Sequence, residues 1–313
     1  MHCTKNKISH EVSRMRSNVG KKNYINGKLY HLCFVFLCLF CIIPILSVIS
    51  ISVSNETNIA NNGYKLIPEA FSFEAYRYIF GNPGSILNAY KISILITVMG
   101  GILGLLIMAM FAYSVSRQDF KHRNKFSFFI FFTMIFNGGL VPTYIVVARI
   151  LHLSDTIWAL IVPYLVSAWF IIIMRTYFQS IPMALIESAK IDGAREFRTF
   201  FTIVLPLSKP ALATIGLFIV LNYWNDWFLA LMYLSPSAEN LIPLQFMLYR
   251  IMNNIQFLTQ QMSSSAVSID LSKLPSESAR MAMCIIAAGP MLFVFPFFQK
   301  YLVKGLTVGA VKG

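Results

Sequence analysis

Charged residues are scarce in this sequence, and acidic residues are the scarcest among them. Only 12% of the 313 residues are charged, and 13 Asp and Glu stand against 26 Lys and Arg. So few charges cannot cover a water-soluble surface when 57% of the residues are hydrophobic and the mean hydropathy is +0.64. The shortage excludes a soluble protein and indicates an integral membrane protein.

Several motifs of catalysis and ligand binding are also missing. The sequence has no GxxxxGK[ST] run, so the chain lacks a P-loop with which to hold nucleotide phosphates. It has no HExxH or GxSxG run either, and we expect no enzymatic activity. None of the five histidines lies within an apolar run or near another at ligand spacing. We therefore expect no metal site and no cofactor.

Cysteine content and net charge exclude two further classes. The cysteine count of five is odd and most of these residues fall in apolar runs, which argues against a disulfide framework. Cys38 and Cys41 form a CxxC without a thioredoxin-like context, and we interpret them as small apolar residues of a helix. The net charge of +13 is scattered in short clusters without a nucleic-acid motif. We expect no nucleic-acid partner.

Apolar runs long enough to cross a bilayer occur six times. A membrane-spanning helix needs about 20 mostly apolar residues, because ~30 Å of hydrocarbon is crossed at about 1.5 Å per residue. Each span must be helical, since an open strand edge would leave backbone groups unpaired in lipid. The sequence predicts an all-α membrane protein whose spans are Leu32–Val53, Asn88–Val115, Phe126–Ala148, Thr156–Met174, Ala211–Leu234 and Met281–Phe298.

The distribution of basic residues predicts the orientation of these spans. With a cytoplasmic N-terminus, the cytoplasmic segments carry 19 of the 26 Lys and Arg. We expect a multi-pass protein of the bacterial plasma membrane with both termini in the cytoplasm. A cleaved signal peptide ending near Ser52-Val53-Ser54 is the alternative for the first span, but its apolar run is too long and its leading tail unusual.

A charged segment, ESAKIDGAREFRTFFTIVLPLSKP, separates the fourth and fifth spans on the predicted cytoplasmic side. Ser180 can cap a helix that ends at Gly193, which supplies a left-handed turn, and a second short helix is halted by Pro206. The prediction is a helical elbow whose exposed apolar residues need a partner. An amphipathic helix lying on lipid headgroups is the alternative.

This segment resembles the EAA loop of permease subunits of ATP-binding cassette (ABC) importers. The family pattern is E-A-A, three residues, G, nine residues, I, one residue and L-P. Six of its seven fixed positions are matched, by Glu187, Ala189, Gly193, Ile203, Leu205 and Pro206, while Ser188 replaces the middle alanine. The resemblance extends from about Asn88 to the C-terminus and is closest to carbohydrate permeases related to the smaller permease of the maltose importer. FNGGLVPTYIVV and PFFQKYLVKGLTVGAVKG are similar to segments of oligosaccharide permeases.

The resemblance implies the type I ABC importer permease fold, with the elbow as coupling helix. It implies half of a transmembrane pathway for a saccharide, and the two segments similar to oligosaccharide permeases favour an oligosaccharide. The expected partners are a cytoplasmic ABC ATPase dimer, a second permease subunit and an extracellular solute-binding protein. The residues that it assigns to ATPase coupling are Glu187, Ser188, Ala189, Asp192, Gly193, Ile203, Leu205 and Pro206.

The predicted spans and the resemblance together divide the chain into four parts. These are a basic cytoplasmic tail (1–31), the first transmembrane helix with an extracellular segment (32–87), the permease domain (88–300) and a cytoplasmic C-terminal tail (301–313). An ion-coupled secondary transporter is the alternative function. It predicts paired intramembrane acids and inverted repeats, and Asp226 is the one clear candidate acid.

Polar residues within the fifth span are candidates for the substrate path. On a continuous helix, Asn222, Asn225 and Asp226 share one face, with Tyr223 and Trp227 on an adjacent one. Amide and carboxylate oxygens can bond to sugar hydroxyls, and aromatic rings can cover the apolar face of a pyranose. The alternative is that the rings anchor the helix at the membrane interface and the polar groups bond to neighbouring helices.

Glycines mark two other spans. In the third span, Asn137 precedes two glycines and a proline, which predicts a kinked or unwound helix that either lines the path or fits a neighbour. In the second span, Gly100 and Gly104 form a GxxxG, which predicts close packing against another helix.

Overall fold

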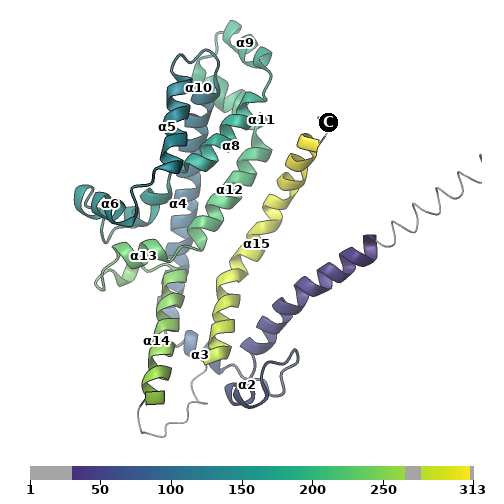
Figure 1. Ribbon diagram of the computed structural model, residues 1–313, viewed down its shortest axis with the longest axis vertical. Coiled ribbons are helices and arrows are strands. Elements are labelled where there is room, and N and C mark those ends of the chain that lie inside the picture. The colour runs from purple at the N-terminus through teal and green to yellow at the C-terminus, as the bar shows by residue number, and fades with distance from the viewer. Residues whose placement is uncertain (1–29, 265–275, 311–313) are drawn as a thin grey trace, which may run out of the picture. The chain divides into compact units, whose positions relative to one another are not determined.

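Figure 1 shows the computed structural model, which describes residues 30–264 and 276–310. Within these ranges the secondary structure is helical, apart from an isolated bridge between Ser54 and Phe71. The predicted tail at 1–31 lies almost entirely outside the described residues, as do residues 311–313. The chain divides into two compact units, residues 1–75 with 275–282, and residues 76–274 with 283–313.

The first unit contains the N-terminal helix Tyr30–Ser52, α2 (Glu56–Asn62) and the beginning of α15 (Ser276–Ala310). The N-terminal helix exposes large apolar side chains along its length, which suits a lipid environment. The buried carboxylate of Glu56 accepts hydrogen bonds from the Glu277 amide at 2.9 Å and the Ser278 amide at 3.1 Å. It also accepts from the hydroxyls of Ser276 and Ser278, and so satisfies free donors at the start of α15.

The second unit is built around α4 (Pro83–Ser116), which packs chiefly against α12 (Lys209–Trp224) and α8 (Ala168–Gln179). These three helices lie side by side in Figure 1. At about 1.5 Å per residue, the 34 residues of α4 span roughly 50 Å, more than the hydrocarbon layer needs. This unit also contains part of α3 (Glu74–Ile79) and α14 (Leu244–Ser264).

The GxxxG of α4 packs closely against its neighbours, as the sequence predicted. A Cβ atom added at Gly100 would lie 2.4 Å from Cζ of Tyr223, and one added at Gly104 would lie 2.9 Å from the Leu165 carbonyl oxygen. Absence of side chains at these two positions therefore lets α12 and the α7–α8 connection approach α4.

Three of the predicted spans are broken helices. The third consists of α5 (Arg123–Ile135) and α6 (Leu140–Ile145) with a π-helical turn to Ile150, bent by 112°. The fourth consists of α7 (Ile157–Ile161) with a 3-10 turn (Val162–Tyr164), followed by α8 after a bend of 51°. Counting each bent pair as one span, the described residues give six spans and confirm the predicted fold class.

The fifth span is also broken, which the sequence does not predict. An 84° bend separates residues 196–207 from α12, which ends at Trp224. The apolar residues after it form a separate short helix, α13 (Phe228–Tyr233), followed by a 3-10 turn at Glu239–Leu241. The prediction of one continuous helix over Ala211–Leu234 is therefore wrong.

Candidate functional site

The charged segment after the fourth span folds into the predicted elbow. Its first arm is α9 (Met183–Ile191), and its second is α10 (Glu196–Thr199) with a π-helical turn over Phe200–Val204 and α11 (Leu205–Leu207). Gly193 turns the chain between the arms with φ +75°, and the Ala194 amide donates to the Ala189 carbonyl at 2.9 Å. A left-handed residue at this point is most easily a glycine. The predicted role of Gly193 in the turn is confirmed.

Two details of the predicted elbow are wrong. Ser180 does not cap α9, because its hydroxyl donates to the Tyr177 carbonyl and Pro182 occupies the cap position. Pro206 does not halt the second arm, which continues to Leu207. The π-helical turn bonds the Leu205 amide to the Phe200 carbonyl, and Pro206 falls in the first turn of α11, where a missing N–H is tolerated.

The elbow leaves much of its surface uncovered. Ile191 is 86% exposed and Phe197 is 72% exposed, and both are large apolar residues. The predicted coupling residues fall into two groups. Those with exposed side chains are Glu187, Ser188, Asp192 and Pro206, whereas Ala189 is buried, and Ile203 and Leu205 are half-buried. Ala189 therefore packs against other residues of the same chain. The exposed surface of α9 includes its neighbours in the sequence, Glu187 and Ser188.

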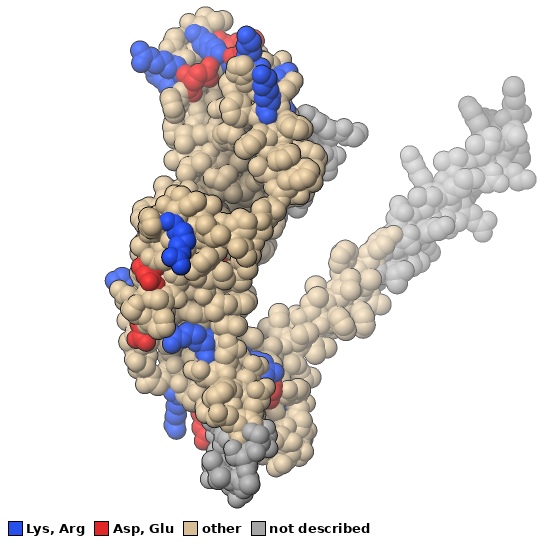
Figure 2. Space-filling model, turned by 60° about the vertical axis from the view of Figure 1, so that its left-hand side comes forward, with Lys and Arg blue, Asp and Glu red and all other residues tan. Residues whose placement is uncertain are grey.

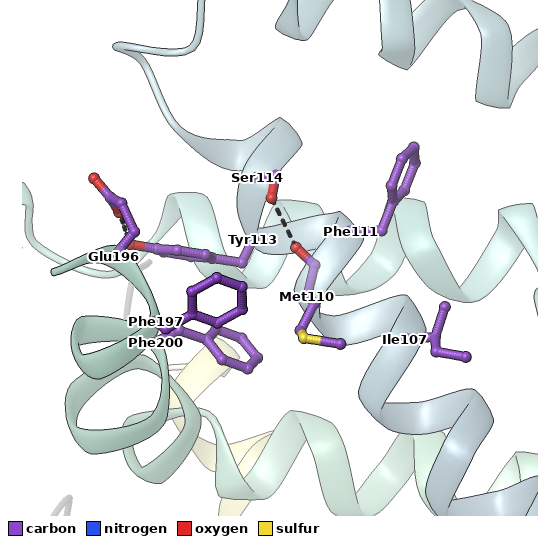
Figure 3. Close-up of a pocket in the computed structure, with 8 residues that line it drawn as sticks. All are labelled: Ile107, Met110, Phe111, Tyr113, Ser114, Glu196, Phe197 and Phe200. Carbon is purple, nitrogen blue, oxygen red and sulfur yellow. Dashed lines mark hydrogen bonds between the residues drawn. The ribbon is translucent and has the colours of Figure 1, made fainter.

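Four charged side chains tie the elbow to the end of α4, and we call them the elbow clasp. Arg117 donates to Asp119 through Nε at 3.0 Å and Nη2 at 2.7 Å. Lys190 of α9 lies 2.8 Å from both Asp119 and Glu196, the first residue of α10. In Figure 3 the Tyr113 hydroxyl of α4 reaches Glu196, at 3.0 Å. The clasp thus joins α4 to both arms of the elbow.

An apolar cavity of about 410 Å³ adjoins the clasp. Figure 3 shows Phe197 and Phe200 of the elbow below Tyr113, with Ile107 and Met110 of α4 further along its wall. Figure 2 shows Lys and Arg gathered with acidic side chains at the end of the molecule that carries α9 and α10. An apolar surface beside paired charges suits a protein partner.

The clasp changes the titration of its members. Hydrogen bonds from Arg117 and then Lys190 hold the pKa of Asp119 well below its usual range. Hydrogen bonds to Asp119 and then Glu196 raise the pKa of Lys190. Both residues are therefore charged at neutral pH, so the ion pairs persist there.

The polar residues of the fifth span surround the break between α12 and α13. Because α12 ends at Trp224, Asn222, Asn225 and Asp226 do not share one face of a helix, which corrects the prediction. Asp226 accepts from the Leu229 amide in the first turn of α13 and from the Tyr164 hydroxyl, both at 3.1 Å. Its carboxylate therefore holds the break in place.

The aromatic neighbours of this break have different environments. Tyr223 is buried against Gly100 and donates from its hydroxyl to the Ile161 carbonyl at 2.8 Å. Trp227 is 37% exposed and stacks on Tyr249 of α14 with ring centroids 4.4 Å apart. The side chains of Asn222 and Asn225 are exposed. The two asparagine side chains and the Trp227 ring are therefore accessible near the break.

The third span is unwound where the sequence predicted it. Asn137 Oδ1 accepts from the Gly139 amide at 2.9 Å, and Gly139 has φ +85°. The Thr143 hydroxyl donates to the Gly139 carbonyl at 2.8 Å. Asn137 is exposed and fixes the local turn with its side chain.

Sequence reasoning missed the elbow clasp and a second polar region. The acids of the clasp, Asp119 and Glu196, could have been found by asking how each of the few acids next to a span is paired. The second region is a cavity of about 630 Å³ beside the start of α4 and α14, which we call the Arg250 cavity. Asn88, Asn240, Asn254 and Glu239 line it together with Arg250.

Six helical spans, unwound span centres and a charged elbow define a polytopic permease of the type I ABC importer fold. The family of binding-protein-dependent transport system inner membrane components matches residues 121–308. The chain belongs to this family. It is a permease subunit of an ABC sugar importer and not an enzyme. The resemblance based on the EAA loop is thereby confirmed, and the alternative of an ion-coupled secondary transporter is not supported.

Individual proteins agree with this assignment. The chain is 38% identical over 298 residues to the polygalacturonan/rhamnogalacturonan transport system permease protein YtcP of Bacillus subtilis (strain 168), covering 93% of this chain and 100% of that protein. It is 29% identical to the arabinooligosaccharides transport system permease protein AraQ of Halalkalibacterium halodurans, covering 90% and 94%. The crystal structure of a bacterial ABC transporter that imports the acidic polysaccharide alginate contains a chain with TM-score 0.74 and 28% identity, covering 90% and 98%.

Permeases of this family work with an ATPase, a second permease subunit and a solute-binding protein. The family description and the six spans also make this chain a multi-pass protein of the inner membrane.

Proposed function

We propose that the exposed surface of the elbow binds a separate ATPase and that the elbow clasp carries its movement to α4. The observation that carries this proposal is the position of Lys190, which bonds both to Asp119 beyond α4 and to Glu196 of the second arm. Movement of α9 would pull on the α4–α5 connection through these contacts. Glu187, Ser188 and Asp192 offer polar contacts to the ATPase, and Ile191 offers an apolar one.

Reversing one exposed charge tests the docking surface. In the complete importer, we expect Glu187→Lys to abolish saccharide uptake while the chain stays in the membrane, because a partner that accommodates the carboxylate would meet a cation. Gly193→Pro should have the same effect by removing the turn. Glu74→Lys, an exposed charge reversal in α3, is the control. Normal uptake by both elbow variants would contradict the proposal.

In this proposal, the substrate path runs beside the break between α12 and α13. Asn222, Asn225 and Trp227 have exposed side chains and are assigned to contacts with the sugar. Tyr223, Asp226 and Asn137 support the path indirectly, since each makes a hydrogen bond that fixes a helix break or a neighbouring helix. Trp227→Ala should therefore weaken uptake through lost stacking, whereas Asp226→Ala should also lower the stability of the chain.

The saccharide is an acidic oligosaccharide in this proposal. Arg250 lines a roomy cavity together with several asparagine side chains and Glu239, and within the described residues it has no ion pair, even with Glu239. Guanidinium groups bind carboxylates bidentately, and amides bond to hydroxyls. The alginate importer and the polygalacturonan permease agree with this substrate class.

Competition for uptake tests the substrate class. We expect oligogalacturonides to compete with the transported saccharide more strongly than neutral oligosaccharides of equal length. Arg250→Gln should reduce this preference at least tenfold, whereas Lys91→Gln, which removes an exposed charge outside this cavity, should leave it unchanged. Equal competition by neutral and acidic sugars in the wild type would contradict the acidic class without affecting the coupling proposal.

A further inference from the structure

A second cavity lies beneath the elbow, on the side of α9 away from its exposed surface. It has a volume of about 370 Å³ and is bounded by the end of α4, the start of α5, the end of α8 and the start of α9. This volume is within the range of about 300–1,000 Å³ of small-molecule sites. Because Arg123 of α5 lines it, we call it the Arg123 cavity.

Arg117 lines this cavity and has an unused hydrogen-bond donor. Its side chain is only 6% exposed, and Nε and Nη2 both donate to Asp119. Its remaining nitrogen, Nη1, is buried and has no acceptor among the described residues. Buried polar groups are normally paired, and a charged donor without an acceptor is especially unfavourable. Nη1 has almost no accessible surface, so an acceptor in the cavity would reach it after a shift of the Arg117 side chain.

Arg123 adds a positive charge that the clasp does not balance. It is half-buried and makes no ion pair within the described residues, whereas Arg117 and Lys190 share two carboxylates in the clasp. Of the described residues that line the cavity, none is acidic, and Gln118 and Gln179 add neutral amides. The cavity therefore favours an anion with several acceptor oxygens.

We propose that the Arg123 cavity binds a phosphate group, either from an anionic lipid or from a soluble phosphorylated compound. The Arg123 guanidinium donates to its oxygens, a shift of the Arg117 side chain brings Nη1 within reach of them, and the two glutamine amides complete the shell. A phosphate suits this donor set because guanidinium groups bind its oxygens through parallel hydrogen bonds. A lipid source is compatible with the cavity lying at the end of transmembrane helices, where headgroups gather.

A bound phosphate would also act on the elbow. Met183 and Ile186 of α9 form one wall of the cavity, opposite the α4–α5 connection. The ligand would thus join the same two parts of the chain that the clasp joins, and would restrain the elbow. Phosphate occupancy is thereby a means of regulating transport.

Binding to the purified full chain tests this proposal. The chain is placed in phosphatidylcholine nanodiscs, and inorganic phosphate is titrated in one arm while 5 mol % phosphatidylglycerol is included in the other. Binding is read by native mass spectrometry and by the melting temperature. We expect saturable binding of at least one probe, weakened at least tenfold by Arg123→Gln. Lys121→Gln removes an exposed charge from the same connection, outside the cavity, and should change binding less than twofold.

The two arms separate the sources of the phosphate. Saturable binding of inorganic phosphate supports a soluble ligand, and retention of phosphatidylglycerol alone supports a lipid. Absence of binding in both arms would overturn the proposal. So would equal weakening by Arg123→Gln and Lys121→Gln, since that result would show general attraction to a basic surface. Arg123 is outside the clasp, so its variant leaves the ion pairs of the elbow intact.

Discussion

Gly100 shows how a single missing side chain sets the packing of the membrane helices. Its Cα faces the ring of Tyr223, whose hydroxyl is fixed by the Ile161 carbonyl at 2.8 Å. The ring therefore cannot move aside without breaking a buried hydrogen bond. Next to it, Gly101 has its nearest neighbour, Val220 Cγ2, at an ordinary van der Waals distance of 3.7 Å from an added Cβ.

Gly100→Ala should therefore destabilise the chain, and Gly101→Ala should not. We expect Gly100→Ala to lower the free energy of unfolding by about 1–3 kcal/mol, the usual effect of overpacking a close contact. Gly101→Ala is the matched control, because it adds the same methyl group to the same helix. Thermal unfolding of both variants in detergent measures the difference. Equal melting temperatures would show that the Tyr223 ring can move away from the added methyl group without a loss of stability.

At the scale of elements, the clasp makes the connection between α4 and the elbow depend on pH in a defined direction. The pKa of Asp119 is lowered by Arg117 and Lys190, so its carboxylate stabilises the clasp fully above the ordinary Asp pKa of about 3.9. That contribution is lost only as the pH falls through the lowered pKa. The clasp should thus stay intact at pH 5.

Removing one donor should raise the Asp119 pKa toward its ordinary value. We expect Lys190→Met to do so, because the 2.8 Å hydrogen bond from Lys190 is lost while Arg117 remains. The ¹³Cγ shift of Asp119, assigned with Asp119→Asn in an aspartate-labelled chain, measures the titration. Lys209→Met, outside the clasp, should leave it unchanged. A pKa of Asp119 that is the same in all three proteins would show that the clasp does not form.

The elements also show what local sequence signals can predict. Gly193 could be assigned its left-handed turn because few other residues adopt that conformation. The end of α12 is not predicted, because apolar residues continue to Leu234 and the sequence pattern places Asn225 and Asp226 within one continuous helix. Asp226 is three residues before Leu229, the spacing at which a carboxylate accepts from the first turn of a new helix.

At the scale of the whole molecule, the distribution of basic residues predicts which side of the membrane each loop faces. The elbow and the α4–α5 connection should be cytoplasmic, and α2 should be outside. In a chain whose native cysteines are replaced, we expect a membrane-impermeant maleimide added to intact cells to label Asn62→Cys. Ser188→Cys should react only after the membrane is permeabilised. Both positions are exposed, so accessibility within the protein is matched. Labelling of Ser188→Cys in intact cells would show that the orientation is the reverse of the predicted one.

Contacts between residues far apart in the sequence are harder to predict from the sequence than the type and position of the helices. The six spans and the elbow follow from local apolar runs and from a spaced motif, which are read along the chain. The pairing of Lys190 with Asp119 joins residues 71 positions apart, and no local pattern specifies it. The Arg250 cavity likewise depends on how α14 lies against α4.

The contact of Glu56 with α15 has a consequence for biogenesis. Ser276 and Ser278 leave the ribosome more than two hundred residues after Glu56. Until residues 276–278 have been synthesised, this carboxylate has no helix end to bond. Truncated nascent chains that end before residue 276 should therefore expose α2 to protease, and chains that include α15 should protect it.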